Sequence, residues 1–423
     1  MPRKLDVSAS SATADSAKDN RWSIVMLLFA AMTIAYIDRG NMAVAAPVLE
    51  SELGLSKSSV GLVLSAFFWA YAVVQLPAGW LIDRVDVRKV YAWAFAGWCL
   101  VTMATGFVSG VAALIGMRML LAVGESVSTP ASHRSIRYLF GPDERGLPTG
   151  VYSSGTKLGP AIGTPLAALL LLHSGWRGLF WITGAAGLLW LWPWLKIYRS
   201  PPAEPTQQQP AAEPAGGLRE VLSAFRLRAV WGIFLGFFCY GYIWHVYATW
   251  LPGYLVAERK MSLLQMGFWG ALPFMAFAAT IPVAGFVSDR LLADGREPTR
   301  TRKTFISVGL AMGSLIVPAA YVDSAQTAVW LLTASAGGIG LSTANIWVIT
   351  QTIAPAGRVG TWIGIQNLGG VLGAALAPLV TGLLADRTGS VVAPLSLAGA
   401  VSCLGILCYV YLIPDLTRPG DAA

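Results

Sequence analysis

The chain has 423 residues, of which 55% are hydrophobic and only 12% are charged. About a quarter of the residues of an average soluble domain are charged, so this composition excludes a soluble fold of such length and favours a protein embedded in a bilayer. The net charge of +8 does not gather in a basic cluster with interleaved aromatic residues, which argues against nucleic-acid binding.

Apolar stretches long enough to cross a bilayer as helices occur twelve times along the chain. Their approximate bounds are 22–48, 58–82, 89–109, 111–138, 147–172, 177–198, 229–256, 264–289, 303–321, 326–353, 358–384 and 391–413. We therefore predict an all-α membrane protein with twelve transmembrane helices. An even number of helices places both termini on the same side of the membrane.

Polar segments divide this succession of helices. Residues 1–21 lack the apolar core of a signal peptide, and we predict a disordered cytoplasmic tail there. Residues 199–228 are rich in Pro, Gln and Ala, which is typical of a flexible linker. The linker separates an N-terminal six-helix bundle (22–198) from a C-terminal six-helix bundle (229–413), and residues 414–423 form a second tail.

The distribution of Lys and Arg predicts the orientation in the membrane. If the N-terminus is cytoplasmic, the cytoplasmic segments hold 22 of the 30 basic residues, and the opposite loops hold five. Because basic residues concentrate in cytoplasmic loops, we expect both termini and the linker on the cytoplasmic side.

A string of the form Gly-x-x-x-Asp-Arg ends one predicted helix in each half. Its occurrence at equivalent positions indicates an internal repeat. The Gly allows close helix approach, and the Asp can accept hydrogen bonds from the N-terminus of a helix in the other half. The string therefore predicts a cytoplasmic gate, although a simple topology signal at the helix end is the alternative. The gate residues are Gly79, Asp83 and Arg84 in the first half and Asp289 and Arg290 in the second.

Away from the ends of the predicted spans, five charged side chains lie within them, all in the N-terminal half: Asp38, Arg39, Arg118, Glu125 and Lys157. A charge in a span costs about 2.5–3.5 kcal/mol or more, so each is a functional candidate. Arg118 and Glu125 are seven residues apart, about two helical turns, and so face the same way. An Arg can hold a carboxylate with two hydrogen bonds, and a buried Glu can take up and release a proton.

A structural network of ion pairs is the alternative interpretation, with Asp38 beside Arg118 or Glu125 beside Lys157. Neighbouring side chains point about 100° apart on a helix, which favours Arg39 toward a substrate and Asp38 toward Arg118. Lys157 lies too deep in its span to reach water easily, so it is either a substrate contact or a structural partner.

Aromatic side chains with one polar end suit a partly wet cavity. Tyr36 and Tyr71 would line such a cavity if the first two helices face it, although tyrosines also serve in packing. His245 is balanced between ligand contact and packing. Four cysteines lie in apolar stretches at spacings that suggest neither a disulfide framework nor a metal site, and we expect no metal and no cofactor.

Several motifs resemble the anion:cation symporter branch of the major facilitator superfamily, which includes bacterial hexuronate, galactonate and glucarate permeases and animal sialin. The similar strings are Tyr36-Ile-Asp38-Arg39-Gly-Asn41 through Pro47, Arg118-x6-Glu125, and Pro130 through Gly146, running on to Gly150 and Ser153-Ser-Gly155. The resemblance covers residues 22–413, essentially all of the predicted membrane part.

This resemblance implies a transporter that imports a small organic anion, usually a carboxylate, with protons by alternating access. It assigns the carboxylate to Arg118 and proton coupling to Glu125 and Asp38. The remaining expected substrate contacts are Tyr36, Arg39 and Tyr71 in the first half and Trp347 and Asn367 in the second. We expect a monomer in the bacterial cytoplasmic (inner) membrane.

Lys157 departs from the family pattern, because related permeases more often have an uncharged polar group there. It could meet a second carboxylate or a different anion, so a sugar acid is only one possible substrate. Two alternative functions use the same scaffold: an exporter of a metabolite or drug, and a transport-dead anion sensor. A membrane enzyme is disfavoured because no nucleophile–base set, metal-ligand cluster or phosphate loop is evident.

Overall fold

The computed structural model describes residues 20–140, 146–199, 223–355 and 359–416, except for some side chains within them, and these parts are helical with no strand. The first half contains α2 (Arg21–Leu53), α3 (Lys57–Arg84), α4 (Val87–Thr105), α5 (Val111–Glu125), α6 (Ser128–Leu139), α7 (Gly146–Leu188) and α8 (Leu191–Ile197). The second half contains α10 (Arg228–Ala257), α11 (Leu263–Ala293), α12 (Pro298–Gly313), α13 (Ile316–Tyr321), α14 (Ala325–Ile353), α15 (Val359–Thr388), α16 (Val392–Leu407) and a π-helical turn (Cys408–Leu412). The predicted tails and most of the predicted linker lie outside the described residues.

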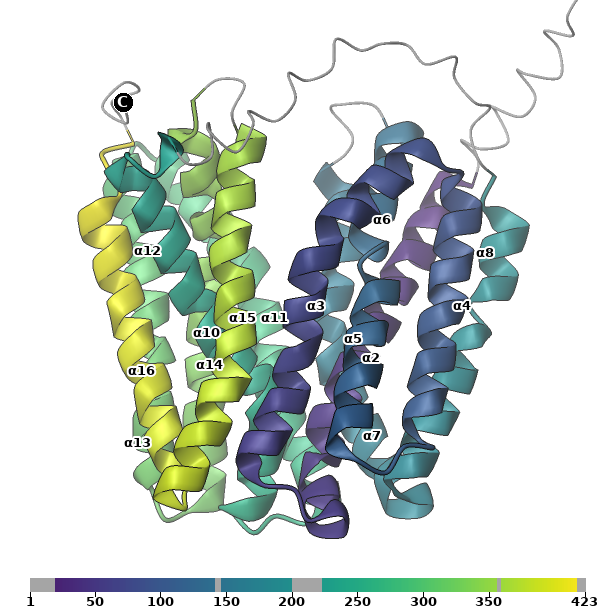
Figure 1. Ribbon diagram of the computed structural model, residues 1–423. Coiled ribbons are helices and arrows are strands. Elements are labelled where there is room, and N and C mark those ends of the chain that lie inside the picture. Colours follow the sequence, from purple (N-terminus) through teal and green to yellow (C-terminus); the bar gives the residue numbers. More distant parts are fainter. Residues whose placement is uncertain (1–19, 141–145, 200–222, 356–358, 417–423) are drawn as a thin grey trace, which may run out of the picture.

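The helices form two bundles that stand side by side, one from each half of the chain (Figure 1). The bundles meet where α3 packs on α15, α7 on α11, and α2 on α10. The last described residue of the first bundle and the first of the second lie at one end of the molecule, which we call the linker end. The other end is called the opposite end.

Ten helical stretches in the described residues are long and apolar enough to cross a membrane, so the chain is a multi-pass membrane protein. One of them, Pro148–Ile197, covers two of the predicted spans. It is interrupted at Gly175, where φ of +66° ends the regular helix and reverses the chain between 147–172 and 177–198. The 19-residue α4 covers the predicted span 89–109 but is less apolar than these ten. The number twelve and the cytoplasmic termini stay predictions.

Small residues let the helices approach closely, as is typical of membrane proteins. A side chain on Gly159 of α7 would meet the Tyr36 side chain of α2 at 2.5 Å. On the other side of the first bundle, a side chain on Gly124 of α5 would meet Trp98 of α4 at 2.8 Å. These contacts hold α7 against α2 and α5 against α4, and a hydrogen bond from Arg39 to Glu125 links α2 to α5.

Candidate functional site

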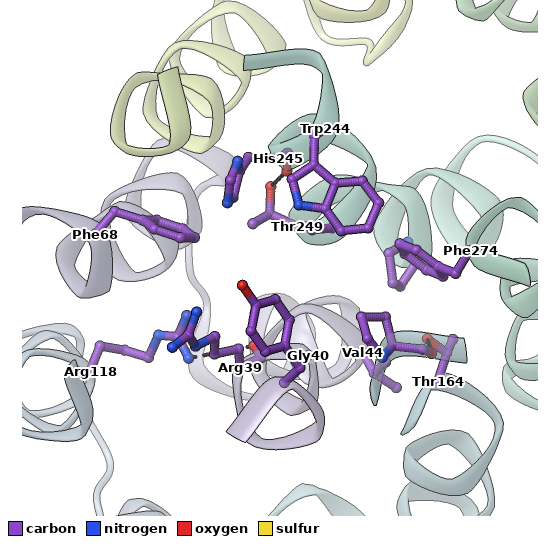
Figure 2. A pocket seen from close by; sticks show the side chains of 14 residues that line it. Arg39, Gly40, Val44, Phe68, Arg118, Thr164, Trp244, His245, Thr249 and Phe274 are labelled. Carbon is purple, nitrogen blue, oxygen red and sulfur yellow. Dashed lines mark hydrogen bonds between the residues drawn. The ribbon is translucent and has the colours of Figure 1, made fainter. Parts of the chain in front are cut away.

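A cavity lies between the two bundles, where helices of opposite halves face one another. Its wall combines residues from α2, α3, α5 and α7 with residues from α10 and α11. Figure 2 shows side chains of the two halves facing one another across it. The lining residues are Tyr36, Arg39, Gly40, Val44, Phe68, Arg118, Pro160, Thr164, Trp244, His245, Ala248, Thr249, Pro252 and Phe274.

Arg39 and Glu125 form an ion pair that links α2 to α5. The Nε–H of Arg39 donates to Oε2 of Glu125 across 2.5 Å, and the Glu125 side chain is fully buried. Arg39 also lies over the rings of Tyr36 and Tyr71, at 4.4 and 5.2 Å from their centroids. Arg39 lines the cavity while Glu125 lies behind it, so the charge of Arg39 is already balanced by a protein carboxylate.

Arg118 also lines the cavity, but it has no carboxylate partner among the described residues. Its guanidinium donates a long hydrogen bond of 3.5 Å to the Arg39 carbonyl and lies 5.1 Å from the Phe67 ring centroid. Only 3% of the residue is exposed, and its Nε has no hydrogen-bond partner in the part of the chain that the structure describes. A buried cation in this condition is available to an anionic ligand in the cavity.

Asp38 is 2% exposed, and neither of its carboxylate oxygens has a hydrogen-bond partner among the described residues. The pairs considered from the sequence are therefore not the ones formed: Asp38 does not pair with Arg118, and Glu125 pairs with Arg39 instead of Lys157. The reason lies in the register between α2 and α5, which places the Arg39 side chain against Glu125.

Lys157 lies on aromatic rings of the second half. Its ammonium is 4.0 Å from the Trp244 centroid and 4.6 Å from that of Phe277, and it forms no ion pair with a described residue. Each such contact contributes about 0.5–2 kcal/mol, so the two together offset part or all of the cost of roughly 2.5–3.5 kcal/mol for a cation inside a membrane. The rings carry no net charge, so no described residue neutralises this ammonium.

The remaining predicted substrate contacts differ in position. Tyr36 lines the cavity, and Tyr71 stacks on Phe67 at 5.7 Å, one layer behind it. Trp347 packs against Phe237 at 5.0 Å and is partly buried. Asn367 is exposed on α15, about two turns before Ala375. Neither Trp347 nor Asn367 lines the cavity.

The predicted gate is described only in the second half. Asp289 is exposed and pairs with Arg302 of its own half at 3.3 Å, while Arg302 also donates to Asn345. Arg290 is exposed. The surroundings of Gly79 and the side chains of Asp83 and Arg84 lie outside the described part of the structure. The gate therefore stays a prediction, and in this conformation Asp289 is bound within one half.

The chain matches the sequence model of the Major Facilitator Superfamily over residues 28–378, most of its length. It belongs to this superfamily. The match makes the protein a transporter and not an enzyme, as the sequence motifs predicted. Among the described residues of this major facilitator, no group of three or more His, Cys, Asp or Glu could hold a metal ion.

Characterised and solved relatives extend the comparison over nearly the whole chain. The D-galactonate transporter of Escherichia coli O6:H1 is 32% identical, with 95% of this chain and 97% of that protein covered. The probable sulfoacetate transporter SauU of Cupriavidus necator is 34% identical, with 91% and 92% covered. A solved bacterial homologue of the human lysosomal transporter Spinster, inward-facing and unoccupied, superposes with a TM-score of 0.74 at 19% identity, covering 94% and 96% of the chains.

Sequence reasoning missed most of the wall that the second half of this major facilitator contributes. His245 had been left undecided; its Nδ1–H donates to the Gly241 carbonyl at 2.8 Å, and its ring meets Phe68 edge-on at 4.7 Å. Trp244 and Phe274 also line the cavity. Apolar and aromatic residues of this kind occur throughout membrane helices, so only the packing of α10 and α11 against the first half distinguishes these three.

Proposed function

We propose that this major facilitator imports a small organic anion with protons across the bacterial inner membrane. The observation that carries the proposal is the position of Arg118: a buried cation without a carboxylate partner that lines the cavity between the halves. A guanidinium can hold a carboxylate or sulfonate with paired hydrogen bonds. The relatives named as galactonate and sulfoacetate transporters support an anion of this class.

Proton coupling follows from the ion pair behind Arg118. While Glu125 is ionised, it holds the Arg39 guanidinium away from an incoming anion. A proton on Glu125 removes that attraction, and Arg39, which already lines the cavity, becomes a second cation for the substrate. A bound anion in turn favours the proton, because it competes with Glu125 for Arg39. This reciprocal linkage couples the two ligands without direct contact between them.

The conformation suits release toward the linker end. The inter-half contacts of α3 with α15, such as Ser65 Oγ donating to the Ala375 carbonyl at 2.6 Å, lie between the cavity and the opposite end. Gly267 of α11 lies against Pro165 of α7 on the same side of the cavity. Since basic residues concentrate at the linker end, that end is cytoplasmic in our proposal, and the conformation is inward-facing.

Transport into proteoliposomes tests the proposal. Labelled D-galactonate and sulfoacetate are presented with and without an inward proton gradient. We expect at least one anion to accumulate above its external concentration only with the gradient, and to exchange with internal unlabelled anion without it. Gradient-independent accumulation would reject proton coupling. Absence of both uptake and exchange for these two and for a wider panel of carboxylates and sulfonates would reject the anion site.

A further inference from the structure

Lys157 lies on the face of α7 that lines the cavity. Pro160 and Thr164, three and seven residues further along the helix, both line it, and residues at this spacing share one helix face. Lys157 is half-buried, and its ammonium rests on Trp244, another lining residue. Lys157 is not itself part of the cavity wall, but it lies directly beside the wall on the α7–α10 side, against Trp244.

Two cations without a carboxylate partner among the described residues thus lie at one cavity, Arg118 in its wall and Lys157 beside it. Arg118 extends into the cavity from α5, whereas the Lys157 ammonium, on α7, lies against the Trp244 ring that lines it. Figure 2 shows Arg118 and Trp244 on different sides of the cavity. The third cation, Arg39, is balanced by Glu125. An anion with one charged group would satisfy Arg118 and leave Lys157 on its aromatic rings.

We propose, building on the proposed anion transport, that the preferred substrate carries two anionic groups, one bound by Arg118 and the other by Lys157. A flexible ammonium stem can leave the rings and reach the second group, and an ammonium accepts carboxylate, sulfonate or phosphonate alike as a point charge. Lys157 is therefore the residue that determines the preference for a dianion over a monoanion of the same length.

Binding of matched anion pairs tests this role. The pairs are galactonate with galactarate, butyrate with succinate, and propionate with sulfoacetate, each added to purified protein while thermal unfolding and apparent Kd are measured. We expect the dianion of at least one pair to bind the wild-type protein at least about tenfold more tightly than its monoanion. Lys157→Gln should raise the apparent Kd of the dianion about tenfold and that of the monoanion by less than about twofold, since one charge-assisted contact is lost.

Two further variants keep the test decisive. Lys157→Arg retains the charge and should retain the dianion preference even if Lys157→Gln does not fold. Lys196→Gln removes another Lys that lies on a Trp, at 4.9 Å from the Trp192 centroid but on α8, away from the cavity, and should change nothing. Equal binding of mono- and dianions by the wild-type protein, or an unchanged preference in Lys157→Gln, overturns the inference. Failure of every anion to bind instead rejects the anion site itself.

A separate observation concerns the opposite end of the molecule. The carboxylate of Asp386, near the end of α15, accepts hydrogen bonds from the backbone N–H groups of Lys57 and Ser58 at 2.9 and 2.8 Å. These groups open α3, so a side chain of one half caps a helix of the other. The contact lies in the string Gly382-Leu-Leu-Ala-Asp386-Arg387, a third copy of the Gly-x-x-x-Asp-Arg pattern.

The glycines beside this cap allow the two backbones to touch. A side chain on Gly382 would meet the Lys57 carbonyl oxygen at 2.4 Å, and one on Gly61 would meet the Pro378 carbonyl oxygen at 2.5 Å. The same sequence pattern that predicts a gate at the linker end thus closes the opposite end in this conformation. We infer that Asp386 and the start of α3 form a latch that must open for the substrate to enter from that side.

Distances between spin labels test the latch. Labels are attached at Ser174 and Gln326, exposed residues of different halves at the opposite end, after the exposed Cys403 is replaced by Ser. We expect Asp386→Asn to shift the distance distribution toward a longer separation. Glu297→Gln is the matched control, because Glu297 also accepts two backbone N–H bonds but at the start of α12 in its own half. An unchanged distribution in Asp386→Asn, or an equal shift in Glu297→Gln, contradicts the latch.

Discussion

The guanidinium of Arg39 lies 2.5 Å from the carboxylate of Glu125, and this pair joins α2 to α5 directly behind the cavity. Removing only one partner of a buried pair leaves the other charge uncompensated, which commonly costs about 3–5 kcal/mol. The pair therefore cannot open without a replacement for one of its charges. In our account a proton neutralises Glu125 when the pair opens, and the substrate anion takes the place of Glu125 beside Arg39.

Glu125→Gln mimics the protonated carboxyl group permanently. We expect this variant to exchange internal for external anion at a rate within about threefold of wild type, while losing proton-driven accumulation, since a binding site is kept but the coupling proton is not. Counterflow and gradient-driven uptake are measured on one preparation. Glu52→Gln is the control: Glu52 accepts a hydrogen bond from Trp176 and lies 3.8 Å from Arg177, outside the cavity. If Glu125→Gln accumulates the anion as the wild-type protein does, the coupling proton is carried by a group other than Glu125.

Asp38 is the second acid proposed for coupling, and it is buried without a hydrogen-bond partner among the described residues. Asp38→Asn keeps the shape and removes the titrating group. We expect uptake by this variant to lose its dependence on external pH, with counterflow retained. The exposed Asp323→Asn should behave as wild type. If Asp38→Asn accumulates anion with the wild-type pH profile, Asp38 has only a structural role.

Gly159 positions Tyr36 by allowing α7 to approach α2. An added methyl group would lie 2.5 Å from the Tyr36 Cβ and 2.9 Å from the Thr33 carbonyl oxygen. We expect Gly159→Ala to destabilise the protein by about 1–3 kcal/mol, measured as a lowered Tm, and to weaken anion binding. Gly150→Ala, on the same helix with nothing within 4 Å, should leave Tm unchanged or slightly higher, because Ala favours a helix. Equal Tm values for the two variants would contradict this packing.

Much of the fold was predictable from the sequence, because bilayer thickness requires long apolar helices and these stand out in the chain. The cost of a charge in a span likewise identified Arg118 and Glu125, and their seven-residue spacing predicted a shared face. Both side chains interact with Arg39 in the structure.

The ionic pairing was not predictable. Periodicity places a residue on one face of its own helix but does not determine its height against a neighbouring helix. For this reason Arg39, rather than Asp38, is the residue of α2 that pairs across to α5. The contribution of Trp244 and Phe274 to the cavity was not predictable for a related reason: their role depends on how the two bundles meet. The role of the third Gly-x-x-x-Asp-Arg string depends on the contact of Asp386, on α15, with the start of α3, which the sequence does not show.

Counterflow by Arg118→Lys tests the central claim most directly, because it needs no proton gradient and reports on the anion site alone. The variant keeps the positive charge but cannot reproduce the two parallel hydrogen bonds of a guanidinium. With the labelled anion that the wild-type protein exchanges, we predict at least about a tenfold loss of counterflow at limiting concentration, equivalent to about 1.4 kcal/mol. Arg177→Lys, at an exposed Arg near the break in α7, should exchange normally. Wild-type counterflow by Arg118→Lys at both limiting and saturating anion would contradict the account.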